Sequence, residues 1–63
     1  MEQITLKAAR VNVNLTQAQA AKELNISVST LKRWEKGIAY PNQPQIEALC
    51  SLYKVSYDRI FFA

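Results

Sequence analysis

The sequence predicts an all-α fold: a compact bundle of five short helices in a single domain that spans residues 1–63. Apolar residues recur at three- and four-residue spacings, and no stretch alternates long enough to favour a strand. The only glycine and one of the two prolines stand where a helix would end and begin. With 49% apolar residues the chain can build one small core, although a domain of this size buries only about 60% of its unfolded surface.

The first helix is predicted from about Gln3 to Val13, because its apolar residues lie close to one face. It stops before Asn14, a residue type that tolerates a left-handed backbone. The second helix opens at Thr16. Thr16 and Gln19 have the spacing of a capping box, in which each side chain satisfies a free backbone N–H of the other residue.

The third helix is predicted from Val28 to Lys36, with Ser27 as its N-terminal cap. Asn25 interrupts the second helix, and Gly37 ends the third as a left-handed C-cap. The second and third helices are therefore joined by only about three residues, 25–27, and such a tight junction forces a steep crossing angle.

Small and apolar residues occupy the positions at which this crossed pair would be buried. Ala21 is small where the third helix must approach the second. The positions that would seal the pair against another helix are also apolar: Ala20, Leu24, Ile26, Leu31 and Trp34. The exposed positions between them are Ser, Thr, Lys and Arg. Residues 17–36 are thus predicted to form a helix-turn-helix unit.

The fourth and fifth helices complete the bundle. Pro44 suits the first turn of the fourth, which places Cys50 on the apolar stripe as a small core residue. Ser56 is expected to cap a short fifth helix that carries Ile60, Phe61 and Phe62. Since adjacent helical residues cannot both face one core, one of the two phenylalanines is expected at the surface, where it would suit a contact between two copies.

The composition excludes several classes of function. The chain has no histidine, one cysteine, no paired carboxylates and no glycine-rich loop, so no enzyme activity, metal site, cofactor or small-molecule ligand is expected. No stretch approaches the roughly 20 apolar residues that span a bilayer, and the N-terminus is too polar for a signal peptide. A cytoplasmic protein that does not contact membranes is expected.

The charge is distributed unevenly. The net charge is +3, and residues 1–37 carry six basic and three acidic residues, whereas residues 38–63 carry two of each. This distribution indicates a half that faces a polyanion and a neutral half.

In the spacing of several motifs the chain resembles the lambda-repressor-like, or xenobiotic-response-element, helix-turn-helix domains. This family includes phage repressors and Cro proteins. The resemblance extends from about Leu6 to Phe62 and rests on these pieces: Leu6-Lys-x-x-Arg10, Leu15-Thr-Gln-x-x-x-Ala21, Leu31 with Trp34, Glu35-Lys-Gly37, Pro41, and Leu52-Tyr-Lys-Val-Ser56. The chain departs from the family at Asn25, where glycine is usual, and at Trp34, where a smaller aliphatic residue is common.

The resemblance implies that the third helix enters the major groove of double-stranded DNA. Base contacts are expected from Val28, Ser29, Lys32 and Arg33. The two cations would donate to guanine O6 and N7, and the valine would pack on a thymine methyl group. Contacts with the DNA backbone are expected from Gln17, Ser27, Lys36, Tyr40 and Gln43. The family also pairs an arginine of its first helix with a glutamate that ends the third, here Arg10 and Glu35, as a structural ion pair.

The sequence therefore predicts a DNA-binding transcriptional regulator, most simply a repressor of the phage repressor or Cro type that binds a two-fold symmetric operator as a homodimer. It would act in bacteria, encoded by the host or a phage, and associate with the nucleoid. The alternative is a protein-interaction module of the same fold, an antitoxin or a coactivator adaptor.

Overall fold

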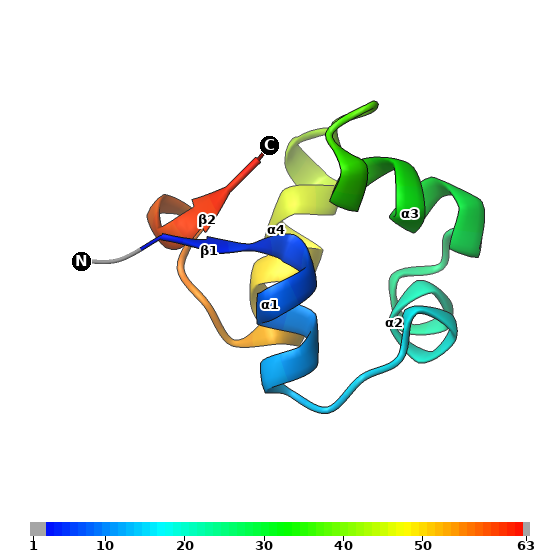
Figure 1. Ribbon diagram of the computed structural model, residues 1–63, viewed down its shortest axis with the longest axis horizontal. Helices are drawn as coiled ribbons and strands as arrows, with labels where there is room; N and C mark the ends of the chain where they lie inside the picture. The colour runs from blue at the N-terminus through cyan, green and yellow to red at the C-terminus, as the bar shows by residue number, and fades with distance from the viewer. Residues whose placement is uncertain (1–2, 63) are drawn as a thin grey trace.

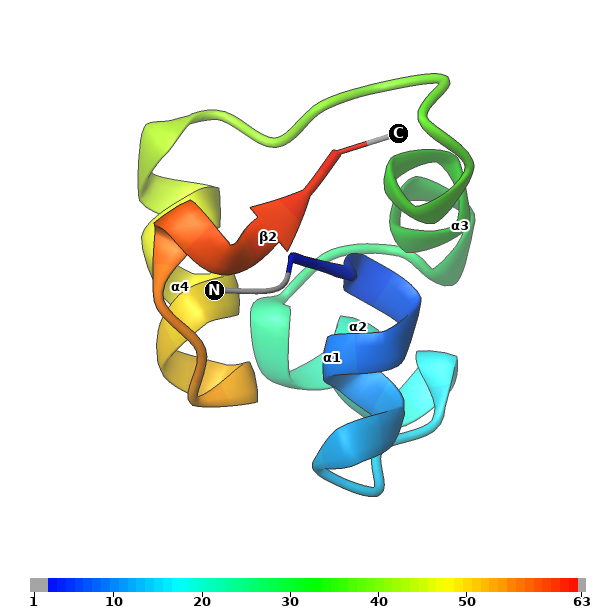
Figure 2. The same cartoon turned by 60° about the vertical axis from the view of Figure 1, so that its left-hand side comes forward.

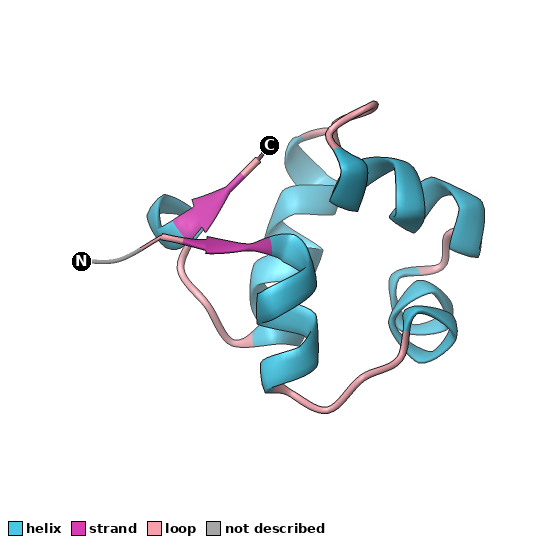
Figure 3. Ribbon diagram, viewed as in Figure 1, coloured by secondary structure: helices cyan, strands magenta, loops and turns pink. Residues whose placement is uncertain are grey.

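The computed structural model describes residues 3–62; residues 1, 2 and 63 of the predicted domain lie outside the described residues. Within residues 3–62 there are four α-helices and two short strands, coloured by type in Figure 3. The helices are α1 (Leu6–Asn12), α2 (Gln17–Leu24), α3 (Val28–Lys36) and α4 (Gln43–Tyr53). The strands are β1 (Ile4–Thr5) and β2 (Ile60–Phe61), and the 3-10 turn η1 (Tyr57–Arg59) precedes β2.

The fold is mostly helical, but the prediction of five helices was wrong at the C-terminal end. Residues 57–59 form a single 3-10 turn, and the Ser56 side chain makes no capping hydrogen bond. Strand β2 then pairs in parallel with β1, so that Ile4 lies opposite Ile60. Figures 1 and 2 show the two strands side by side, at opposite ends of the chain. The β-branched and aromatic residues of both segments favour extended backbone, and their pairing overrides the helical spacing.

The same pairing shortens the first helix. It begins at Leu6 rather than near Gln3 and ends at Asn12. Thr5 has an extended backbone, and its side chain accepts a hydrogen bond from the N–H of Ala8 at 3.1 Å. Thr5 therefore both ends β1 and caps α1.

The caps predicted around α2 and α3 are confirmed. Thr16 and Gln19 form the reciprocal capping box, and Ser27 caps α3. Asn14, Asn25 and Gly37 all have positive φ angles. Two features at the ends of α4 were not predicted, a second capping box between Asn42 and Gln45, and a left-handed C-cap at Lys54 with φ of 55°.

The core lies where α1, α4 and the α2–α3 pair meet. Its buried apolar residues come from every helix and from β2: Leu6, Ala9, Ala20, Ala21, Leu31, Trp34, Leu49, Tyr53 and Ile60. Cys50 is only half-buried against this cluster, and burial raises the pKa of its thiol. Phe61 is exposed and Phe62 is half-buried. One phenylalanine is thus at the surface as expected, although the cause is the alternation of side chains along extended backbone rather than a helix.

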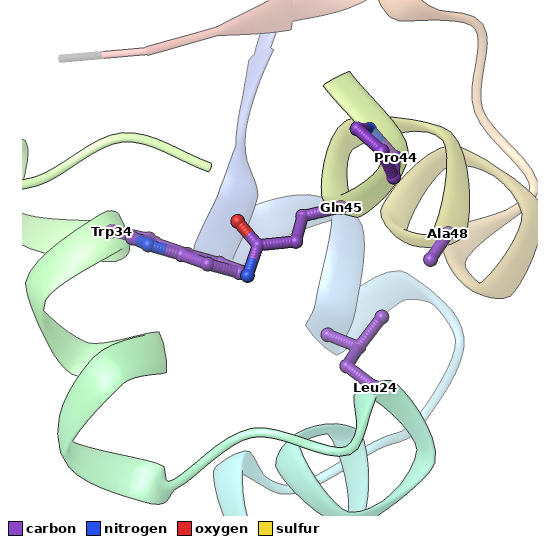
Figure 4. Close-up of a pocket in the computed structure, with 5 residues that line it drawn as sticks. All are labelled: Leu24, Trp34, Pro44, Gln45 and Ala48. Carbon is purple, nitrogen blue, oxygen red and sulfur yellow. The ribbon is translucent and has the colours of Figure 1, made fainter. Parts of the chain in front are cut away.

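Trp34 borders a small apolar cavity. The cavity has a volume of about 170 Å³ and lies where α2, α3 and α4 meet. Figure 4 shows the Gln45 side chain reaching from α4 toward the indole, with Leu24 and Ala48 also on the wall. The indole is 4% exposed, so this large side chain is accommodated inside the fold where the family commonly has a smaller one.

Candidate nucleic-acid interface

Helix α3 is held against α2 by a short, well-defined turn. Asn25 adopts left-handed backbone (φ 58°, ψ 44°), and the N–H of Ile26 donates to the carbonyl of Ala21 at 3.0 Å. Ala20 and Ala21 are almost fully buried, at 0% and 2% exposure. Because these side chains are so small, α3 can approach α2 closely, and the two helices cross steeply on one side of the molecule (Figure 1).

Helix α3 has one buried and one exposed face. Leu31 and Trp34 point into the core. The opposite face is exposed and carries five of the residues singled out in the sequence: Val28, Ser29, Lys32, Arg33 and Lys36. The structure therefore brings all four expected base-contact residues and one expected backbone contact onto a single cationic surface. A helix with such a face has dimensions that fit the major groove.

A buried polar cluster of Arg10, Gln17 and Glu35 joins the three N-terminal helices. The Arg10 Nε donates to Glu35 Oε2 at 2.8 Å, and Arg10 Nη1 donates to the carbonyl of Leu15 at 2.8 Å. Gln17 Nε2 donates to Glu35 Oε1 at 3.0 Å. The side chains of the ion pair are only 9% and 6% exposed. This cluster fixes the end of α3 relative to α1 and to the start of α2.

Two of the expected backbone contacts already have partners within the protein. Besides its bond to Glu35, Gln17 is half-buried at the first position of α2. The Ser27 hydroxyl accepts a hydrogen bond from the N–H of Thr30 at 3.1 Å. It also forms a 2.8 Å hydrogen bond with the Thr30 hydroxyl. An amide nitrogen carries two N–H groups, so Gln17 keeps one that can donate to a phosphate. The Ser27 hydroxyl can donate to a phosphate when the Thr30 hydroxyl is the donor of the 2.8 Å bond.

The remaining two expected contacts lie beyond α3. Tyr40 is 62% exposed and borders a groove of about 180 Å³ with residues of α4 and the C-terminal segment. Gln43 is exposed at the first position of α4.

Lys7 was not among the residues predicted to contact DNA. Its side chain lines a depression of about 200 Å³ together with Gln17, Lys32, Glu35 and Lys36. Lys7 follows the first residue of α1 and is exposed. Only the packing of α1 beside α3 brings it near the two lysines of α3, so no local sequence signal could have found it.

Within residues 3–62 no group of three or more histidine, cysteine, aspartate or glutamate side chains could hold a metal ion. No helix in that range has the length and apolar character to cross a membrane.

Comparison with known proteins agrees with this geometry. A family model described as helix-turn-helix matches residues 6–60. The HTH-type transcriptional activator BcrR of Enterococcus faecalis is 33% identical over 55 residues, which cover 87% of this chain. The chain spans only about a quarter, 27%, of the length of that relative. No solved structure shows significant similarity to the chain.

Proposed function

Since the chain belongs to the lambda-repressor-like helix-turn-helix family, we propose that it is a transcriptional regulator that binds duplex DNA with α3. The observation that carries this proposal is the exposed face of α3, on which Lys32, Arg33 and Lys36 stand opposite a fully buried Leu31. A protein-interaction module would not need three cations on this face, so the alternative of an antitoxin or adaptor is less well supported.

The first turn and the centre of α3 carry the proposed base readout. Val28 would pack on a thymine methyl group, Ser29 would bond a base edge, and Arg33 would donate to guanine O6 and N7. Gln17, Ser27, Lys36, Tyr40 and Gln43 would contact the sugar–phosphate backbone. In this arrangement the Arg10–Glu35 pair orients the reading helix and does not touch DNA.

We further propose that the protein binds as a homodimer to a two-fold symmetric operator. Exposed apolar side chains beyond α3 offer a surface for this contact, with Ile38 70%, Tyr57 59% and Phe61 50% exposed. Two half-sites would then lie about one helical turn of DNA apart, roughly 34 Å. A monomeric mass in sedimentation at high concentration, with and without the operator, would exclude the dimer.

We propose that binding represses transcription by occluding a promoter. The protein would act in bacteria, encoded by the host or a phage, and associate with the nucleoid. The name of the Enterococcus faecalis relative describes an activator, which makes activation the second candidate. A reporter gene with the selected site placed either over the promoter or upstream of it separates the two: repression lowers output in the first arrangement, and activation raises it in the second.

The decisive test is selection of duplexes from a random pool, followed by titration at two salt concentrations. A specific site should bind at least about a thousandfold tighter than random duplex. Weak binding that ignores sequence and disappears at physiological salt would refute the proposal and direct attention to a protein partner.

A further inference from the structure

The depression beside α3 gathers positive charge on a concave surface. Lys7 comes from α1, while Lys32 and Lys36 come from α3, and all three side chains are exposed. Lys32 and Lys36 are four residues apart, so they lie on the same side of the helix. Like charges around a hollow reinforce one another's potential and attract an anion.

The one carboxylate in this depression is already neutralised. Glu35 Oε2 accepts from Arg10 at 2.8 Å, and Oε1 accepts from Gln17 at 3.0 Å. The Glu35 side chain is only 6% exposed. Its charge is therefore balanced inside the protein, and the three lysines leave the depression with an excess of positive charge.

The start of α2 adds donors at the same place. Gln17 is the first residue of α2, and the first bond within that turn runs from the N–H of Ala20 to the carbonyl of Thr16 at 2.9 Å. The N–H of Gln19 donates to Thr16 Oγ1 at 3.1 Å. The N–H groups of Gln17 and Ala18 have no acceptor within the helix. They add a partial positive charge beside the lysines.

Arg33 lies at the edge of the exposed face of α3, away from Lys32. It follows Lys32 by one residue, which corresponds to roughly 100° around the helix, and it does not line the depression. The two adjacent cations of α3 thus face different surroundings, Lys32 beside other lysines and Arg33 beyond them. Adjacent position in the sequence does not imply a shared role.

We propose that this depression binds a phosphate group of the DNA backbone, and that Lys32 acts there with Lys7 and Lys36 instead of reading a base. The inference rests on the proposed DNA-binding function and deepens it. It replaces the sequence-based expectation of a base contact by Lys32 and gives Lys7 a role. Guanine discrimination on α3 then rests with Arg33.

The test compares single variants on the selected duplex and on a panel of its single-base-pair changes. Lys7→Gln and Lys32→Gln should each weaken binding roughly two- to fivefold at low salt, as for loss of one exposed ion pair, and equally on every duplex. Each should also lower the slope of log affinity against log salt by up to about one. Arg33→Gln should change the preference at one base pair instead.

Lys22→Gln is the matched control, because Lys22 is an exposed lysine of α2 that does not line the depression. Its slope should stay at the wild-type value. A changed base-pair preference in Lys32→Gln with an unchanged slope would overturn the inference while leaving the DNA-binding function intact. Absence of any specific duplex binding by the wild type would overturn both.

Inorganic phosphate distinguishes a site for the DNA backbone from one for a free anion. It is titrated at constant ionic strength into the protein–duplex complex. If phosphate displaces the duplex from the wild type, and does so less effectively from the Lys7→Gln, Lys32→Gln double variant, the depression is a site that phosphate shares with the DNA backbone. Phosphate that binds at the depression of the intact complex without displacing the duplex would show a free-anion site and overturn the backbone role.

Discussion

The two halves of the molecule differ in how they are stabilised and in what they expose. Residues 3–37 meet around the buried polar cluster of Arg10, Gln17 and Glu35, and expose cations along α3. Residues 38–62 pack through the apolar side of α4 and the β1–β2 pairing, and expose apolar side chains. The geometry of the cationic surface therefore depends on a few directional bonds, whereas the C-terminal half supplies buried area and the exposed apolar side chains of the proposed dimer contact.

Loss of the polar cluster should have the largest effect. Glu35→Ala leaves the Arg10 guanidinium buried without its carboxylate, which costs about 3–5 kcal/mol of unfolding free energy. A domain of 63 residues has only about 3–9 kcal/mol in total. Urea denaturation at neutral pH measures the loss. Glu23→Ala on the exposed side of α2 is the control and should change stability little. Equal melting temperatures for Glu35→Ala and the wild type would contradict the assigned role.

A substitution in β2 tests residues 38–62 by the same quantity, the unfolding free energy. Ile60 is 5% exposed and its neighbour Phe61 is 50% exposed. Ile60→Ala should cost about 2–4 kcal/mol, because it removes buried methyl groups and leaves a cavity. Phe61→Ala should cost less than about 1 kcal/mol in the monomer, since half of the ring is already in water. Denaturation at low protein concentration compares them, and losses of similar size would argue against the β1–β2 pairing as found.

The features that were predicted from the sequence are those whose partners lie within a few residues of each other. The Thr16–Gln19 capping box and the left-handed Asn25 and Gly37 follow from side-chain chemistry within one turn of helix. The pairing of Ile4 with Ile60 joins the two ends of the chain, and no local window contains both partners.

The same physical limit applies to the candidate site. The exposed face of α3 follows from helical spacing, and the resemblance to the lambda-repressor-like family implied which residues of that face are base-contact candidates. The convergence of Lys7 with Lys32, and the bond between Gln17 and Glu35, depend on how α1 and α2 stack beside α3. Such stacking is a tertiary property. The expected Arg10–Glu35 pair placed the first helix near the end of the third, but no pattern in the sequence placed Lys7 beside Lys32 or joined Gln17 to Glu35.

Left-handed residues occur in both halves and allow a finer comparison. Asn25 and Lys54 each end a helix, with φ of 58° and 55°. Left-handed backbone costs about 1–2 kcal/mol at a lysine. It costs less at an asparagine, because asparagine adopts that conformation more readily. Lys54→Gly should therefore raise the unfolding free energy by about 1 kcal/mol, and Asn25→Gly by a few tenths. Thermal denaturation of both variants measures the difference, and a larger gain at Asn25 would contradict this reasoning.

Tyr53 lies in α4 where the two halves meet, and it should give the smallest effect at neutral pH. It is 3% exposed, and within residues 3–62 its hydroxyl oxygen has no hydrogen-bond partner. Tyr53→Phe breaks no hydrogen bond with another described residue, so the unfolding free energy should change by less than about 1 kcal/mol. Tyr57→Phe, with a side chain 59% exposed, is the control.

The difference between Tyr53→Phe and the wild type should appear in alkali. Burial, reinforced by the charge of Glu35 and opposed by that of Arg10, raises the pKa of Tyr53 to about 12, whereas an unfolded tyrosine has a pKa of about 10. In the folded state Tyr53 keeps its hydroxyl proton to a higher pH than in the unfolded state. The contribution of Tyr53 to the unfolding free energy is therefore complete below about pH 10 and is lost as the pH rises toward about 12. Tyr53→Phe should lack that loss, while Tyr57→Phe should follow the wild type. Tyrosinate absorbance that showed Tyr53 ionising together with exposed Tyr57 would mean that the Tyr53 hydroxyl is in contact with water. Water would then reach the region between the polar cluster and residues 38–62.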